Sequence, residues 1–165
     1  MRLWHSKLIP LLDNPRLSDL HMSCCNLRGL GWGKRNRNIN YIYDDPLGEE
    51  ALVVYHMLVL KEMERREYNF DRKWIEANYC GKRRQARVCD YAKFKKACWR
   101  NVPLKGHTLR FFVNDIKTLQ ERGLDITMHH YSDIDDEGTY TTYIVSRGDK
   151  TIYYGIRTKG GNNYE

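Results

Sequence analysis

The segment LGEEALVVYHMLVLKEMERRE, residues 47–67, decides the fold class of this 165-residue chain. It follows Asp45-Pro46, a pair typical of the start of a helix, and its apolar residues recur at spacings of three and four. The members of this apolar face are Leu47, Ala51, Val54, Tyr55, Leu58 and Met63. Near its polar end, Glu62 precedes Arg66 by four residues, an orientation that stabilises helices. We therefore predict one long helix here and expect it to form the centre of the core.

Helical signals on both sides of this segment predict a mainly α fold. Asp13 can cap a helix over Pro15–Arg28, which Gly29 would end. Further helices are expected at residues 74–79, after Asp71, at residues 88–99, and from Thr108 to just before Gly123. The predicted fold class is a compact multi-helix domain.

Near the C-terminus the pattern changes to the period of two that is typical of strands. Residues 139–146 (TYTTYIVS) and 150–157 (KTIYYGIR) predict an antiparallel β-hairpin, with the Arg147-Gly148-Asp149 triplet at its turn. The acidic residues 133–138 (DIDDEG) are expected to form a loop. The predicted organisation is a helical domain over residues 1–137, a β-hairpin over 138–158 and a flexible tail over 159–165.

The composition restricts the compartment and the partners. The chain has 28 Lys and Arg against 21 Asp and Glu, a formal net charge of +7 that favours polyanionic partners. Its five cysteines include no Cys-x-x-Cys pair, which favours a reduced, cytoplasmic protein without zinc. His129-His130 lacks further ligands at suitable spacing, so we expect a solvated loop there and no metal. Since no apolar run is long enough for a membrane span, we expect a soluble protein without a membrane partner.

Two segments rich in cations predict a nucleic-acid surface. The first, residues 28–37 (RGLGWGKRNR), combines four cations with three glycines and Trp32. Glycines allow close backbone approach, cations neutralise phosphates, and an indole can stack on a base. The alternative is a solvated loop in which Trp32 packs into the core. The second segment, residues 81–87 (GKRRQAR), also lacks an acid, and the two segments can bracket one duplex if the fold brings them together.

The N-terminus offers a second kind of chemistry. The α-amine of Met1 has a reference pKa near 8, which leaves an unprotonated fraction that can act as a nucleophile through a Schiff base. Arg2, Trp4 and His5 follow it directly. The alternative is an ordinary N-terminus, with His5 as a hydrogen-bonded polar residue.

Five motifs carry a more specific signal: MRLWH (residues 1–5), CCNLRGLGWGK (24–34), NY (40–41), YHMLVLKEMERR (55–66) and YCGK (79–82). Together they resemble the pyrimidine-dimer DNA glycosylase family, typified by bacteriophage endonuclease V and including short bacterial proteins. The resemblance is good over about residues 1–85 and weaker to about residue 126, so the hairpin lies outside it.

This resemblance implies a compact, mainly helical enzyme of base-excision repair that needs no cofactor. In the family, the N-terminal amine attacks the sugar C1′ of a damaged nucleotide, and the resulting imine allows β-elimination, the AP lyase step. An Arg-Glu pair on the first long helix assists, and basic residues hold a kinked duplex with a flipped nucleotide. The carboxylate can stabilise cationic sugar character and move protons.

The chain departs from the family pattern at the catalytic pair. An ungapped alignment from the N-terminus places the family's Arg-Glu pair on Met22-Ser23, and a serine cannot supply the charge of the glutamate. Asp19, one helical turn earlier, is the candidate replacement, and His21 is a poorer one. Arg2 is too large for removal of the initiator methionine, so the nucleophile would be the amine of Met1 itself.

The candidate catalytic residues are therefore Met1, Asp19 and His5. The candidate DNA-binding residues are Arg2, Trp4, Arg28, Trp32, Lys34, Arg35, Arg37, Lys82 and Arg83. His56, on the apolar long helix, is expected to be a buried, hydrogen-bonded residue that supports the site.

Three functions follow from these predictions. The favoured one is a DNA-binding member of the family that acts on double-stranded DNA, with damaged or kinked duplexes as candidate ligands and catalysis reduced by the missing glutamate. The second is an active glycosylase and AP lyase that uses Met1 and a relocated acid. The third is an inactive relative that serves as a protein-interaction module or inhibitor, with a protein partner bound by residues 138–158.

Overall fold

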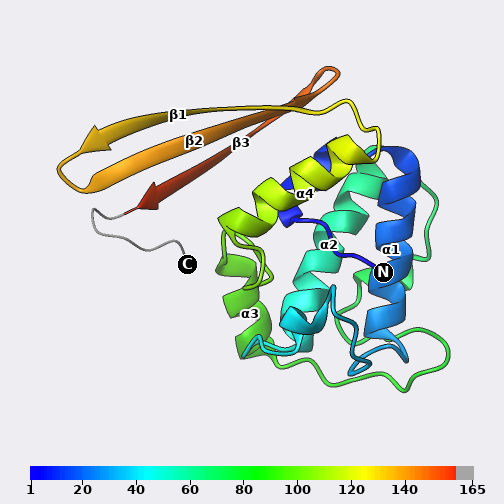
Figure 1. Cartoon of the computed structure of the whole chain (residues 1–165). Helices are drawn as coiled ribbons and strands as arrows, with labels where there is room; N and C mark the ends of the chain where they lie inside the picture. Colours follow the sequence, from blue (N-terminus) through cyan, green and yellow to red (C-terminus); the bar gives the residue numbers. More distant parts are fainter. Residues whose placement is uncertain (159–165) are drawn as a thin grey trace. The chain divides into compact units, whose positions relative to one another are not determined.

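The chain divides into two compact units, Met1–His107 and a second unit that begins at Thr108. The computed structural model describes residues 1–158, and the tail expected at 159–165 lies outside the described residues. The first unit contains, in order, η1 (Ser6–Leu11), α1 (Asn14–Arg28), η2 (Asn40–Ile42), α2 (Glu49–Arg65), η3 (Arg72–Ile75) and α3 (Tyr91–Trp99), where η denotes a 3₁₀ helix (Figure 1).

The helix α2 is the centre of the first unit, as the sequence predicts. It contacts α1, α3 and η1, and most of its residues from Glu50 to Leu60 are buried. The facing side of α1 buries Leu17, Leu20, Cys24 and Leu27. Asp13 caps α1 by accepting a hydrogen bond from the Arg16 backbone N–H, with Pro15 in the first turn. The predicted helices over residues 15–28 and 47–67 are confirmed within two residues at each end.

Two predicted helices of this unit are shorter than expected. Residues 74–79 do not form a separate helix, because the backbone there makes only the single 3₁₀ turn η3. The carbonyl groups of Trp74, Glu76 and Tyr79 accept hydrogen bonds from a distant arginine, Arg28. The helix predicted from Val88 begins instead at Tyr91, where Asp90 caps it by accepting from the Lys93 backbone N–H.

The second unit combines one helix with a sheet. The helix α4 (Leu109–Glu121) is capped by Thr108, and its Phe112 packs edge-on against Tyr143 and Tyr154, with ring centroids 6.1 and 4.9 Å apart. The sheet has three antiparallel strands in the order β1 (Thr127–Asp135), β2 (Gly138–Arg147) and β3 (Lys150–Thr158). The predicted fold class, mainly α with a C-terminal antiparallel hairpin, is confirmed.

The predicted hairpin corresponds to β2 and β3, with Gly148 and Asp149 forming its turn as expected. The strand β1 was not expected, and the loops predicted at residues 133–138 and at His129-His130 are wrong in this respect. His130 pairs with Tyr143, and the β1 ladder continues to Asp135 opposite Gly138. Since nearly all of β1 is exposed, its sequence lacks the apolar alternation that reveals a half-buried strand.

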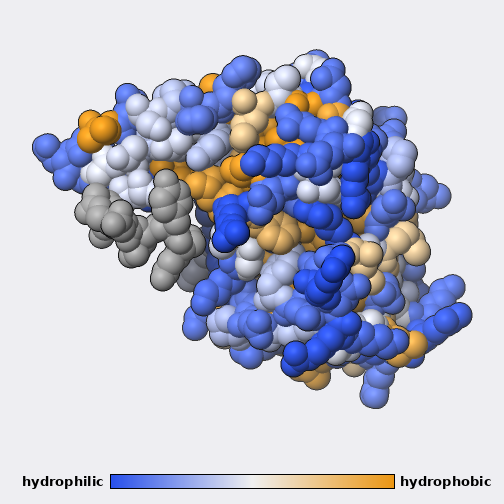
Figure 2. All heavy atoms as spheres, viewed as in Figure 1, coloured by the Kyte–Doolittle hydropathy of each residue, from blue (hydrophilic) through white to orange (hydrophobic). Residues whose placement is uncertain are grey.

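No helix within residues 1–158 is both long and apolar enough to cross a membrane. On the face of the molecule shown in Figure 2, hydrophilic side chains cover most of the surface, and hydrophobic ones gather in smaller patches between them.

Candidate nucleic-acid interface

The first cationic segment forms a tight turn directly after α1. Gly31 donates its N–H to the Asn26 carbonyl, and a Cβ at Gly31 would lie only 2.7 Å from that oxygen, so no larger residue fits without a shift. Trp32 is half-buried, and its ring packs edge-on against Tyr43, whose hydroxyl donates to the Lys34 carbonyl. The packing of Trp32 and Tyr43 holds the turn in place. The side chains of Lys34, Arg35 and Arg37 beyond it are exposed.

The cations of the second cationic segment, residues 81–87, fall into two groups: two arginines form ion pairs with α2, and two other cations are exposed. Arg84 donates both terminal nitrogens to Glu49 at the start of α2, and Arg87 pairs with Glu49 and Glu50. These two arginines therefore fix the segment to α2. Lys82 and Arg83 are exposed.

Arg84 also brings the two segments together. Its Nη1 donates to the carbonyl of Arg28 at 2.9 Å and lies 3.4 Å from the carbonyl of Gly29. Gly29 in turn lies against the backbone of Cys80, because a Cβ added at Gly29 would be 3.3 Å from the Cys80 carbonyl oxygen. Both segments thus leave the core at the Arg28 end of α1 (Figure 1).

We call the exposed cations of these two segments the cationic surface: Lys34, Arg35, Arg37, Lys82 and Arg83. In the part of the chain that the structure describes, none of the five forms an ion pair with a carboxylate. Their positive charge is therefore available to a polyanion from outside.

Arg28, expected to contact phosphate, is instead buried, with 1% of its surface exposed. Its Nη1 donates to His56 Nδ1 at 3.1 Å and to the Trp74 carbonyl at 2.7 Å, and its Nη2 donates to the carbonyls of Glu76 and Tyr79 at 2.7 and 3.0 Å. Burial lowers the pKa of this guanidinium from its usual value. The phosphate contact predicted for Arg28 is corrected to a structural role, because the guanidinium holds the backbone before the second cationic segment.

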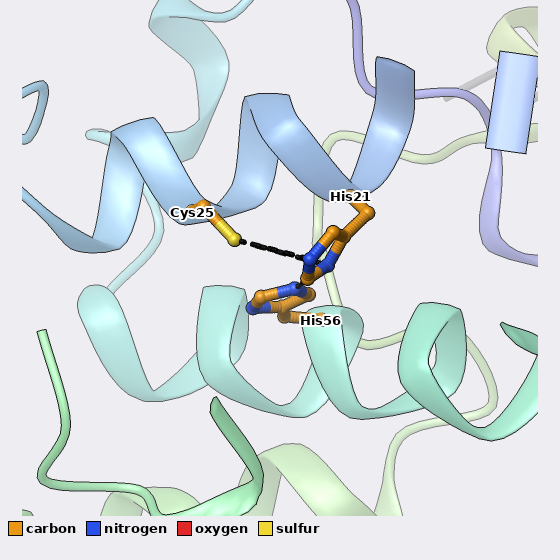
Figure 3. A group of neighbouring side chains, drawn as sticks. All are labelled: His21, Cys25 and His56. Carbon is orange, nitrogen blue, oxygen red and sulfur yellow. Dashed lines mark hydrogen bonds between the residues drawn. The ribbon is translucent and has the colours of Figure 1, made fainter. Parts of the chain in front are cut away.

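Arg28 is hydrogen-bonded to a cluster formed by His21, Cys25 and His56, which we call the histidine cluster (Figure 3). His56 Nδ1 accepts from Arg28, so the neutral imidazole carries its proton on Nε2, which donates to His21 Nδ1 at 2.9 Å. Burial first, and the charge of Arg28 second, lower the pKa of His56 well below its ordinary value. The sulfur of Cys25 lies 3.6 Å from His21 Nε2. Burial raises the pKa of the Cys25 side chain to about 12, so this residue is a thiol and not a nucleophilic thiolate. His56 is thus buried and hydrogen-bonded, as its sequence position predicts.

His21, Cys25 and His56 also place three possible ligand atoms within 4.8 Å of one another. The network around them does not suit a metal ion. A metal-bound imidazole normally donates its outer N–H to a carbonyl or carboxylate. Here the outer nitrogen of His56 accepts from a guanidinium, and the proton lies on the nitrogen that would face the ion. We therefore interpret the group as a hydrogen-bonded cluster.

The residues after Met1 are packed into the first unit. Trp4 is 5% exposed, and its carbonyl accepts from the Tyr55 hydroxyl on α2. His5 Nδ1 accepts from the Lys7 backbone N–H, and its Nε2–H donates to the His107 carbonyl at 3.0 Å. The roles predicted for Trp4 at the nucleotide and for His5 in catalysis would require exposed side chains, whereas the structure gives both residues structural positions.

His107 extends this N-terminal network. Its Nδ1 accepts from the Ser6 backbone N–H, which leaves the proton on Nε2 toward the Tyr41 hydroxyl at 2.9 Å. Its ring stacks on that of His5, with centroids 5.1 Å apart. Burial lowers the pKa of both imidazoles, so His5 and His107 are neutral at pH 7 in the folded protein. Their hydrogen bonds hold residues 5 and 6 against His107.

The remaining candidate residues at the N-terminus and on α1 are exposed or half-buried. Met1 is 45% exposed, and Arg2 is half-buried with its guanidinium 4.6 Å above the Trp4 ring. Asp19 is exposed on α1, and Ser23, one turn later, is half-buried. None of the ion pairs within residues 1–158 joins the Met1 amine or Asp19 to a partner.

The buried histidines predict an acid-sensitive fold. Burial lowers the pKa of His5 to about 4, while the unfolded chain keeps a value near 6.5. Below pH 6.5 the His5 imidazole binds a proton in the unfolded state but not in the folded state, so the free energy of unfolding decreases as the pH falls. For His5 alone we expect a loss of about 2 kcal/mol between pH 7 and pH 5. Urea unfolding at both pH values measures this loss, and His5→Gln should show a smaller one. An equal loss in both proteins would contradict the assignment.

Arg84 and His107 are structural residues that the sequence did not reveal. Arg84 belongs to a run of cations in which no local signal separates the arginine that pairs with Glu49 from its exposed neighbours. His107 follows a glycine in a segment without periodicity. The i, i+4 spacing of His21 and Cys25 was a signal for the histidine cluster, but its third member is 31 residues further along the chain.

Comparison with known proteins identifies the N-terminal part of the chain. Residues 1–76 match the family described as pyrimidine dimer DNA glycosylase. No match was found among curated proteins or among solved structures. The matched residues include α1, α2 and the first cationic segment, whereas Lys82 and Arg83 lie beyond them. Residues 1–76 of this chain are therefore similar to the pyrimidine dimer DNA glycosylases, as the sequence motifs indicate.

Proposed function

We propose that the protein binds double-stranded DNA through the cationic surface. The observation that carries this proposal is the convergence of two acid-free segments, joined by Arg84 at the end of α1, with five exposed cations outside any ion pair in the described residues. Such cations gain affinity by displacing the counterions of DNA phosphates. The family match, whose description names DNA, supports this partner.

Wild-type protein titrated into labelled duplex DNA of about 20 base pairs tests this proposal. We expect saturable binding whose affinity falls steeply as salt rises from 50 to 200 mM. Binding that is weak and independent of salt would overturn the proposal. A duplex that carries an abasic site, compared with an intact one, shows whether damaged or kinked DNA is preferred.

We further propose that glycosylase and lyase activity is reduced relative to the family. Ser23 stands where the resemblance places the catalytic glutamate, and a hydroxyl supplies neither the negative charge nor the proton acceptor that a carboxylate does. The exposed Met1 amine remains the candidate nucleophile. The role of residues 138–158 in binding a protein partner and a cytoplasmic location stay predictions.

Restoring the carboxylate at position 23 should increase the lyase activity. In borohydride trapping on abasic-site DNA, we expect Ser23→Glu to yield at least about tenfold more covalent complex than the wild type, since a positioned acid or base typically contributes 10²–10⁴-fold. Ser23→Gln is the matched control, because it has a similar shape without the charge. Efficient trapping by the wild type, equal to that of Ser23→Glu, would show that the chain has retained activity by another route.

A further inference from the structure

The helix α3 carries aromatic side chains on its exposed side. Tyr91 and Trp99 are 73% and 75% exposed, although Tyr and Trp usually bury most of their surface. Lys95 lies midway between them, and its ammonium is 5.1 Å from the centroid of the Trp99 ring. Because the three residues are spaced by four, they form one stripe along the helix.

The opposite side of α3 packs against the unit. Ala97 is buried and Phe94 is half-buried, and α3 contacts α2. On a helical projection Ala97 lies across from the Tyr91–Lys95–Trp99 stripe, and Phe94 lies to one side of it. The exposed aromatics are therefore not part of the core, and the packing of this helix does not account for them.

The surroundings of the stripe are positively charged. Residues 91–107 contain no Asp or Glu, and α3 adds exposed Lys93 and Lys96 to Lys95. Arg100, after the helix, is bound to the buried carboxylate of Asp45 and is not part of the stripe. A protein partner with an apolar surface would have to desolvate these lysines, whereas a polyanion pairs with them.

We propose that this stripe binds single-stranded DNA, with unpaired bases stacked on Tyr91 and Trp99 and phosphates held by Lys95 and its neighbouring lysines. The two aromatic residues are separated by eight residues, about 12 Å along a helix, a distance that a few nucleotides of an extended strand can span. Every base has a face for stacking, but in a duplex these faces are already covered. DNA is chosen over RNA because the family match names DNA. The inference goes beyond the duplex proposal and does not rest on it.

The test is the affinity of the full chain for labelled oligo-dT of about 20 nucleotides. We expect Tyr91→Ala and Trp99→Ala each to weaken binding about tenfold, and Trp99→Phe to retain most of the wild-type affinity because phenylalanine still stacks. Tyr153→Ala, an exposed aromatic residue on β3, and Lys61→Glu, an exposed cation on α2, are the matched controls and should leave binding unchanged. Charge reversal at Lys95 should weaken binding and reduce its salt dependence.

Three results would overturn the inference. Unchanged affinity of both alanine variants would show that no base stacks on the stripe. Loss of binding in Lys95→Glu alone would indicate a charged surface without stacking. A tenfold preference for oligo-U would reject DNA as the ligand. Duplex affinity should be unchanged in Trp99→Ala, so failure of this inference is distinguishable from failure of the duplex proposal.

Discussion

Reversing the charges of either cationic segment is expected to weaken duplex binding on the order of 30-fold at 0.1 M salt, and reversing both on the order of 1,000-fold. The variants are Lys34→Glu with Arg35→Glu, Lys82→Glu with Arg83→Glu, and the combination of all four. Each lost contact removes the release of counterions from one phosphate, and each glutamate adds repulsion. Fluorescence anisotropy with a labelled duplex measures the change.

The matched control is Lys61→Glu with Lys117→Glu, which changes the net charge equally at exposed positions outside the cationic surface. It should weaken binding less than about threefold, because charges that do not contact a phosphate contribute little at this ionic strength. If this control lost as much affinity as the segment variants, net charge alone would explain the binding. If only one segment mattered, the two would not form one surface.

Replacing Arg28 with alanine is expected to destabilise the protein by about 3–5 kcal/mol. The guanidinium donates to His56 and to three backbone carbonyls between Trp74 and Tyr79. Its removal leaves the buried His56 and three partly buried carbonyls without their donor and leaves a cavity, and both effects are costly. Removal of a buried charge offsets part of this cost. Urea unfolding measures the free energy difference.

Arg35→Ala, an exposed arginine of the same segment, is the control and should change stability by less than about 0.5 kcal/mol. The backbone of residues 74–80 should also become sensitive to proteases in Arg28→Ala, since it loses its main connection to α1. A change of less than about 1 kcal/mol in Arg28→Ala would contradict the structural role assigned to the residue.

The helices α1, α2 and α4 were predictable because their signals are local. Asp13 and Thr108 cap the helices that follow them, and the apolar spacing of α2 and α4 lies within each segment. The strand β1 was not predictable from such signals. Its side chains are nearly all exposed, and it exists because its backbone pairs with β2.

The site was predictable in part. Its exposed cations follow from composition and spacing, but which arginines are buried depends on partners far along the chain. Arg28 binds carbonyls 46–51 residues away, and His5 bonds to His107, 102 residues away. A cation in a glycine-rich segment gives the same sequence signal whether it binds a phosphate or a backbone carbonyl. Only the fold shows that Arg28 is buried and Arg35 is exposed.

The central claim is that the cationic surface contacts DNA phosphates. The most direct measurement is the slope of the logarithm of duplex affinity against the logarithm of salt concentration, for the wild type and the four-charge variant. Five phosphate contacts predict a wild-type slope of about −4 to −5, and loss of four of them predicts a slope near −1. Equal slopes in the two proteins would show that DNA, if bound, is bound elsewhere, and would contradict the claim.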